Sequence, residues 1–385
     1  MYGAMVSLFP SAVISSLTGP WCDKYGYKTA ILVGNVGLLF TLVSTLCTVC
    51  WMWLPLYANV LANIPDGICG GAITVLAAVF SEATVSTSKE KRFIKLFGLN
   101  LTFATLSQTA DMIGGLVLAN AGLNGVLLLA LVVCVFAQIW VLLLFDEKAS
   151  EDTLFVKWKQ FLCLRNVKEG FQTLVKKRSG SRRSQIWSLF VCMAFLTVDY
   201  SAKNVGFFYA SKMYSWSVAY YGFVQCMDSL AKIVVNVPLL WLFSRHLKPS
   251  DPVTAIFGCC FIIGHLLVLG LAYKDWIYYL HCALSTPSVM ARVGIRSHLS
   301  KLVENNEAGK IFSFLSTCES LMPVLGDALF TEVLKASIAS FPGLVYVTSA
   351  AISTIPVLLL VYCVRASRNP TEDSLITSDP SGQAT

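Results

Sequence analysis

Two acid–base pairs inside apolar stretches are the residues of this sequence best suited to chemistry. Asp199 and Lys203 form the first pair, and Asp228 and Lys232 form the second. Each pair is spaced i, i+4, so both of its side chains are expected on one face of a helix. One interpretation is that each pair neutralises itself, which lowers the cost of placing charges in a membrane. The other is a protonatable acid held beside a cation, where a proton or an anion competes for the partner.

A third pair with the same spacing, Arg292 and Arg296, brings two guanidinium groups to the inner half of another apolar segment. Guanidinium groups stay charged and bind carboxylates through two parallel hydrogen bonds. The two arginines are therefore candidate substrate-binding residues, together with Lys203 and Lys232. The alternative is that the arginines are anchors at the inner interface whose side chains reach the lipid headgroups.

The remaining ionisable residues of the apolar segments favour proton transfer. Glu319 and Asp327 are eight residues apart, about two helical turns, so they share a face. His281 lies in the outer third of its segment, and imidazole titrates near neutral pH. These three residues, with Asp199 and Asp228, are candidates for proton coupling. The sequence contains no cluster with metal-ligand spacing and no nucleotide-binding glycine loop, and we predict no metal, no cofactor and no enzymatic activity.

Composition indicates the environment that must position these residues. The chain has 385 residues, of which 56% are hydrophobic and only 13% are charged. A soluble domain is about one-quarter charged, so the sequence predicts an all-α membrane protein. About eleven segments are long enough to cross a bilayer. They lie at about 1–18, 29–50, 54–83, 93–117, 123–145, 186–211, 215–244, 252–273, 275–297, 310–334 and 341–364.

Lysine and arginine alternate in their distribution between the loops. Alternate loops, together with the helix ends beside them, hold 24 of the 29 cations, whereas the opposite loops hold only Lys212, Lys274 and Lys335. Cytoplasmic loops are enriched in cations, so this asymmetry places the basic loops and the C-terminus in the cytoplasm. Topology thus accounts for the net charge of +7, and the sequence predicts no nucleic-acid partner. The expected partners are the lipid bilayer, a small organic anion and protons.

The order of charged and uncharged segments predicts two related halves. Every third span (29–50, 123–145, 252–273 and 341–364) lacks Asp, Glu, Lys and Arg. We expect these spans to face lipid and the others to line an interior, because a charge in contact with lipid is costly. The resulting domains are an N-terminal half, a basic cytoplasmic linker, a C-terminal half and a disordered tail. They are assigned to 1–145, 146–185, 186–365 and 366–385.

The loop from Gly19 to Lys28 resembles the signature loop of major facilitator superfamily transporters. The matching positions are Gly19, Asp23, Lys24, Gly26 and Lys28. The resemblance implies a fold of two pseudo-symmetric helical halves with twelve spans, so the first helix is expected to be missing from this sequence. It also implies that these five residues form a conformational loop, in which the aspartate serves conformational change.

Two later segments resemble the proton-coupled folate transporter family, solute carrier family 46. They are Ile295–Val303 and Glu307–Ser313. Known members move folates and other organic anions with protons, at the plasma membrane or the lysosome. Arg296 matches a family arginine implicated in substrate and proton handling. The sequence departs from the family early in the fifth helix, where Leu99-Asn100 stands in place of an acid.

Two hypotheses follow. The first is a secondary active, proton-coupled transporter of a folate-like or related organic anion that works by alternating access in the plasma or lysosomal membrane. The second is a truncated, non-transporting or regulatory membrane protein with the same fold. The missing first helix and the absent acid of the fifth helix motivate the second hypothesis.

Overall fold

The computed structural model describes residues 2–51, 56–144, 172–173, 175–176, 178, 181–247, 249–304 and 307–368. Among these residues the regular structure is entirely helical. The N-terminal helices are α1 (Tyr2–Tyr25), α2 (Lys28–Cys50), α3 (Leu56–Leu61), α4 (Ile64–Ile68), α5 (Gly71–Val85) and α6 (Arg92–Leu144). The tail assigned to 366–385 lies outside the described residues from residue 369 on, and so does most of the predicted linker 146–185.

The C-terminal helices form continuous rods with short irregular turns. The first is α9 (Arg182–Tyr200), η1 (Ser201–Val205) and α10 (Gly206–Tyr214), followed by α11 (Val218–Leu242) with η2 (Phe243–Leu247) and by α12 (Asp251–Gly270). The others are α13 (Asp275–Ser285) with η3 (Thr286–Ser288) and α14 (Val289–Leu302), then α15 (Ala308–Ser337), and finally α16 (Leu344–Ile352) with α17 (Thr354–Arg368). These rods follow the spans expected from the sequence.

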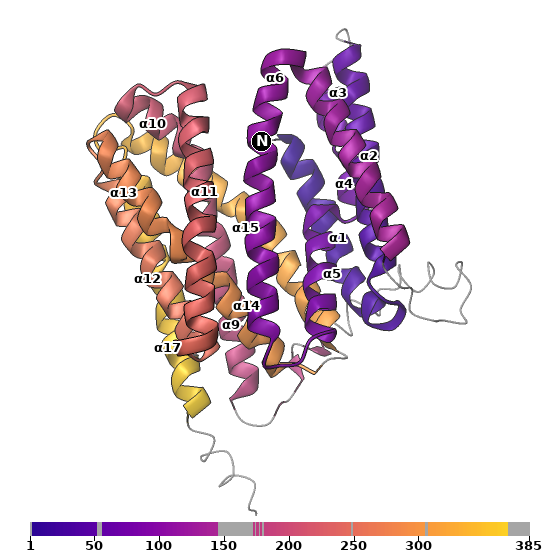
Figure 1. The fold of residues 1–385 in the computed structure, drawn as a ribbon, viewed down its shortest axis with the longest axis vertical. Coiled ribbons are helices and arrows are strands. Elements are labelled where there is room, and N and C mark those ends of the chain that lie inside the picture. Colours follow the sequence, from indigo (N-terminus) through magenta and orange to yellow (C-terminus); the bar gives the residue numbers. More distant parts are fainter. Residues whose placement is uncertain are drawn as a thin grey trace, which may run out of the picture.

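Six helical segments of the described chain are long and apolar enough to cross a membrane. They are Lys28–Cys50, Asn120–Leu144, Arg182–Tyr214, Tyr220–Leu247, Asp251–Gly270 and Leu344–Ser367. The spans expected at 93–117 and 123–145 are the two parts of α6, which non-helical backbone at Gly122 separates. Gly122 has φ 67°, which glycine adopts without steric cost. The chain reverses there, and the two parts of α6 run in opposite directions (Figure 1).

The second part of α6 is antiparallel to α2. Lys28 at the start of α2 donates to the carbonyl of Leu142, near the end of α6. Further along α2, Gln138 donates to the carbonyl of Leu32. The partner residue number falls as the α2 number rises, which defines the antiparallel direction.

The bundle divides between N-terminal and C-terminal helices (Figure 1). Helices α2 to α5 and the second part of α6 lie on one side, α10 to α13 and α17 lie on the other, and the first part of α6, α14 and α15 lie between them. The larger buried cluster belongs mostly to the C-terminal helices and includes Leu189, Met193 and Ile295. A smaller cluster joins α1 and α2 through Trp21 and Ile31.

The expectation that every third span is a lipid-facing support is wrong for α12. Half of the residues in its apolar window are buried, compared with 17% for Asn120–Leu144. Two glycines explain the difference. A Cβ atom added at Gly258 would lie 2.2 Å from the backbone nitrogen of Ala291, and one added at Gly294 would lie 2.8 Å from the nitrogen of Ala255. Because α12 and α14 approach backbone to backbone, α12 is a core helix although it carries no charge in its interior.

Candidate functional site: a charged cavity and a closed end

A cavity of about 260 Å³ lies among the C-terminal helices and is closed on one side by the first part of α6. Its wall contains residues of α9, η1, α11, α12, α13, η3, α14 and α16. Six of the predicted site residues line it: Asp199, Lys203, Asp228, Lys232, His281 and Arg292. The structure therefore brings together ionisable side chains from three separate rods of the bundle.

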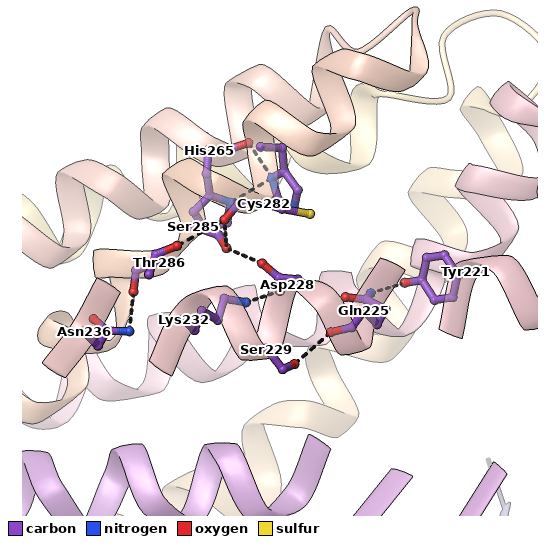
Figure 2. A network of polar contacts seen from close by, with 11 residues as sticks. Tyr221, Gln225, Asp228, Ser229, Lys232, Asn236, His265, Cys282, Ser285 and Thr286 are labelled. Atoms are coloured by element: carbon purple, nitrogen blue, oxygen red, sulfur yellow. Dashed lines mark hydrogen bonds and ion pairs between the residues drawn. The ribbon is translucent and has the colours of Figure 1, made fainter. Parts of the chain in front are cut away.

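Asp228 and Lys232 form the ion pair that their spacing predicts. The ammonium of Lys232 contacts Asp228 Oδ2 within one face of α11. The other carboxylate oxygen, Oδ1, accepts a hydrogen bond of 3.4 Å from Ser285 on α13. Figure 2 shows this chain of polar contacts between the two helices. Lys232 is thus neutralised by its own helix, and Asp228 is held from both sides.

Asp199 and Lys203 do not pair with each other. The α-helix ends at Tyr200, and η1 continues it as a 3₁₀ turn. In a 3₁₀ turn the side chains at i and i+3 eclipse, so Lys203 lies over Tyr200 and not beside Asp199. The distance from Lys203 Nζ to the Tyr200 ring centroid is 4.6 Å. Asp199 is buried and instead accepts a hydrogen bond from the hydroxyl of Ser349 on α16.

Arg292 approaches the same aromatic ring from α14. Its guanidinium carbon lies 4.5 Å from the centroid of Tyr200, and Nη2 donates to the carbonyl of Leu196 at 3.0 Å. The ring of Tyr200 therefore contacts two cations, and the ring quadrupole stabilises both contacts. Its position three residues before Lys203 was a signal that could have identified it from the sequence.

His281 faces a second histidine. Its Nδ1 lies 3.2 Å from Nδ1 of His265 and 2.9 Å from the His265 carbonyl oxygen. His265 is buried, as expected for a packed residue, and it also lines the cavity. In the described part of the chain, no group of three or more His, Cys, Asp or Glu side chains is placed to hold a metal ion.

Arg296, Glu319 and Asp327 lie outside the lining of this cavity. Arg296 Nη2 donates to Glu319 Oε1 at 2.6 Å, and both side chains are largely buried. The guanidinium carbon of Arg296 also lies 4.3 Å from the ring centroid of Phe80 on α5, so Arg296 itself contacts both halves of the bundle. Asp327 accepts a 2.7 Å hydrogen bond from Asn204.

The conformational loop contacts the N-terminus of α15. Asp23 accepts hydrogen bonds from the backbone nitrogens of Gly309 at 2.8 Å and Lys310 at 3.1 Å. The hydroxyl of Tyr27 donates to the same carboxylate at 2.9 Å. A carboxylate here satisfies the free N–H groups and the positive end of the helix dipole. Tyr27, which replaces a cation of the signature loop, therefore binds the loop aspartate.

Backbone contact between α1 and α15 continues from this point. A Cβ atom added at Gly19 would lie 2.3 Å from the carbonyl oxygen of Gly309. One helical turn away, Ser15 donates to the carbonyl of Ser313 at 3.3 Å. We call this contact the α1–α15 seam, defined by residues 12–23 of α1 and 309–317 of α15. The seam closes the end of the bundle at which α1 ends and α15 begins, which we call the basic end.

The other loop residues shape the turn after α1. Gly26 has φ 93°, a conformation that favours glycine. The Lys24 ammonium lies 4.8 Å from the ring centroid of Tyr25. Lys28, as noted, donates to the second part of α6. These residues hold the turn, whereas Gly19 and Asp23 make the contacts with the C-terminal half.

Two further contacts lie at the basic end, one between the halves and one between the predicted linker and α15, and sequence reasoning missed both. Arg92, at the start of α6, is 1% exposed and donates to the carbonyl of Ser300 on α14 at 2.5 Å. Lys176 and Arg178 of the predicted linker bind Glu307 at the start of α15, each at 2.7 Å. Burial acts to raise the pKa of the Glu307 carboxyl, but the hydrogen bonds from the two cations outweigh it and hold that pKa below its ordinary value.

A two-half helical bundle, a charged cavity and a seam at one end are features of a membrane transporter, and comparison with known proteins defines the class. The sequence profile of the Major Facilitator Superfamily matches residues 1–326, so the chain belongs to this superfamily. It is therefore a multi-pass integral membrane protein and a transporter by family, not an enzyme.

Particular relatives confirm the resemblance to solute carrier family 46. The proton-coupled folate transporter of Rattus norvegicus is 24% identical over 371 residues, which cover 96% of this chain and 78% of the relative. The lysosomal proton-coupled steroid conjugate and bile acid symporter of Homo sapiens is 21% identical over 390 residues, covering 98% and 82%.

Solved structures confirm the fold. The human organic anion transporter MFSD10 has a TM-score of 0.76 at 14% identity, over 93% of this chain and 82% of that chain. The major facilitator transporter FucP, in an outward conformation, has a TM-score of 0.65 at 13% identity, over 94% and 89%. At these identities the likeness extends to the fold alone.

Proposed function

We propose that this protein is a secondary active transporter that moves a small organic anion across the membrane together with protons. The observation that carries the proposal is the charge of the cavity. Lys203, Lys232 and Arg292 face two carboxylates, Asp199 and Asp228. The cavity therefore has more cations than carboxylates, and a cavity with an excess of one sign of charge concentrates the opposite ion.

The position of the closed end supports transport by alternating access. The seam, the Arg92 contact and the Glu307 ion pairs all lie at the basic end, while the cavity includes Leu269 and Tyr278, near the opposite ends of α12 and α13. A site closed from one side and reached from the other is one state of a rocking cycle between two halves. In the proposed cycle the basic end is cytoplasmic, and the seam opens when the halves rock.

The relatives support both the substrate class and the coupling. The two relatives described above are named as a proton-coupled folate transporter and a proton-coupled steroid conjugate and bile acid symporter. In this chain we assign proton coupling to Asp199, Asp228 and His281 in the cavity. Glu319 and Asp327 remain candidates that would act from outside it. We propose the plasma membrane or the lysosomal membrane as the location.

The proposal is tested by uptake into proteoliposomes that contain the purified protein. Labelled folate, estrone sulfate and taurocholate would be offered at external pH values of about 5.5 and about 7.5. These two values lie on either side of the ordinary histidine pKa of about 6.5. We expect uptake of at least one anion, faster at the lower external pH and abolished by a protonophore. Equal uptake at both values would contradict proton coupling, and no uptake of any anion would contradict the transport function.

A further inference from the structure

The three cations of the cavity differ in whether they are already neutralised. Lys232 forms an ion pair with Asp228. Neither Lys203 nor Arg292 forms an ion pair with a carboxylate among the described residues, although both line the same cavity. Asp199 lines the cavity as well, and its Oδ1 is bonded to the Ser349 hydroxyl. Unpaired charges at such depth are expected to face a ligand or a partner.

Tyr200 brings the two unpaired cations within reach of one anionic group. Lys203 Nζ and the Arg292 guanidinium carbon are 4.6 and 4.5 Å from the same ring centroid, so the two cationic centres are at most about 9 Å apart. The oxygens of a carboxylate or sulfonate accept hydrogen bonds of about 2.8 Å from each donor, and one such group can therefore bridge a separation of this order. Tyr200 is 47% exposed as a residue and lines the cavity, so an aromatic residue lies beside the bridge.

The rest of the cavity wall suits the body of an organic ligand. Tyr221, Tyr278 and Tyr346 contribute aromatic rings, and Leu266 and Leu269 contribute apolar side chains. A volume of about 260 Å³ is slightly below the ~300 Å³ at which pockets for drug-sized ligands begin. The cavity therefore fits an anionic group with a ring next to it.

We propose that Lys203 and Arg292 form a two-cation site that binds a single carboxylate or sulfonate group of the substrate at the edge of Tyr200. Lys232 does not contact the anion in this arrangement but fixes Asp228. The inference rests on the proposed function, and it narrows the substrate to a planar or aromatic organic compound with one anionic group. It also removes Arg296 from the anion site, because Arg296 is paired with Glu319.

The test measures equilibrium binding to the purified full-length protein in lipid nanodiscs. The probes are 2-naphthoate, 2-naphthalenesulfonate and the neutral 2-naphthamide. We expect the two anions to bind and the amide to bind at least about tenfold more weakly, since it lacks the charge-assisted hydrogen bonds. Equal affinity for the amide and 2-naphthoate would overturn the proposal.

Substitutions locate the binding groups. Lys203→Gln and Arg292→Gln should each weaken 2-naphthoate binding about tenfold or more, and Arg292→Gln keeps a donor for the Leu196 carbonyl. Affinity should recover in Lys203→Arg, which separates a charge requirement from a packing defect. The matched control is Lys335→Gln, at an exposed lysine that pairs with Glu332 far from the cavity, and its affinity should equal that of the unchanged protein.

The outcomes separate this inference from the proposed function. If the unchanged protein transports an anion but Lys203→Gln and Arg292→Gln bind it normally, the two-cation site is wrong and the transport function stands. A loss confined to Lys232→Gln would likewise overturn the assignment of the anion to Tyr200. Failure of the unchanged protein to bind or transport any of the anions would contradict both.

Discussion

The two functional regions of this molecule treat their polar groups in opposite ways. At the basic end, polar groups are satisfied by the protein itself: Asp23 accepts two backbone N–H groups, Arg92 binds a carbonyl, and Glu307 binds two cations. In the cavity, Lys203 and Arg292 are held against Tyr200 without a carboxylate partner among the described residues. A region whose polar groups all have partners within the protein stabilises one arrangement of the chain. A region with unpaired charges is completed by a ligand.

Backbone packing separates the regions as well. Gly19 and Gly309 bring α1 against α15 at the seam, so this contact depends on the absence of side chains at the two glycines. The cavity is instead walled by long polar and aromatic side chains. The seam is therefore sensitive to added volume, and the cavity to changed charge.

The seam can be measured directly with a cysteine reporter. Thr317 donates to the carbonyl of Ala12 at 3.3 Å, so cysteines introduced at these two positions lie on facing helices. A short bifunctional thiol reagent should cross-link them when the seam is closed. Variants with only one of the two cysteines show the background from native thiols.

The largest expected effect comes from Arg296, which pairs with Glu319 inside the C-terminal half and contacts Phe80 of the N-terminal half. Arg296→Met leaves Glu319 largely buried without its partner, at a cost of about 3–5 kcal/mol of stability. The double variant with Glu319→Met should recover most of that loss, as measured by thermal unfolding in detergent. A stable single variant that loses only transport would instead assign Arg296 to substrate or proton handling.

Gly19→Ala should open the seam with the next largest effect. The added Cβ meets the Gly309 carbonyl oxygen at 2.3 Å and Ser313 Cβ at 2.4 Å, so the helices must separate. We expect the cross-linking yield to fall about tenfold or more, which corresponds to overpacking of 1–3 kcal/mol. The matched control is Gly264→Ala, where an added Cβ meets nothing within 4 Å. Equal yields in the two variants would show that the close approach is not required.

Asp23→Asn should loosen the same seam less. The amide keeps one acceptor oxygen but loses the charge that faces the α15 N-terminus, a change of roughly 1–2 kcal/mol. Tyr27→Phe removes only one of the donors to this carboxylate and should have a smaller effect on cross-linking. If Tyr27→Phe lowered the yield more than Asp23→Asn, the helix N-terminus would not be what the carboxylate recognises.

Glu307→Gln should have the smallest effect, and it should not depend on pH between about 5.5 and 7.5. A carboxyl with a lowered pKa keeps its ion pairs above its ordinary pKa of about 4.3 and loses them only when the pH falls through the lowered value. The cross-linking yield should therefore fall by the same few-fold factor at both pH values. A factor that vanished at pH 5.5 would make this ion pair part of the proton coupling.

The sequence predicted the bundle well because composition and charge asymmetry report on the membrane. Apolar length located the rods, and the Asp23 loop identified the superfamily. The prediction from charge content failed for α12. Gly258 and Gly294 allow backbone contact with α14, and this contact buries the helix, which charge content does not indicate. The reversal between the spans expected at 93–117 and 123–145 is present, at Gly122.

The sequence pointed to six residues that line the cavity, but it did not predict how their side chains pair. Spacing i, i+4 gave the correct partner for Lys232, where the α-helix is regular. It gave the wrong neighbour for Lys203, because a 3₁₀ turn intervenes and nothing in the residue spacing announces it. Contacts distant in sequence, such as Ser349 with Asp199 and Phe80 with Arg296, arise from packing of rods and have no local signal.

The most direct test of the account joins the two regions in one experiment. Cross-linking between cysteines at positions 12 and 317 would be followed while 2-naphthoate is titrated into the nanodisc sample. We predict that the anion changes the cross-linking yield in the otherwise unchanged protein and has no effect in Lys203→Gln with Arg292→Gln. If the anion leaves the cross-linking yield unchanged, or changes it equally in the double variant, the result would contradict the claim that the anion binds in the cavity and that this binding alters the seam.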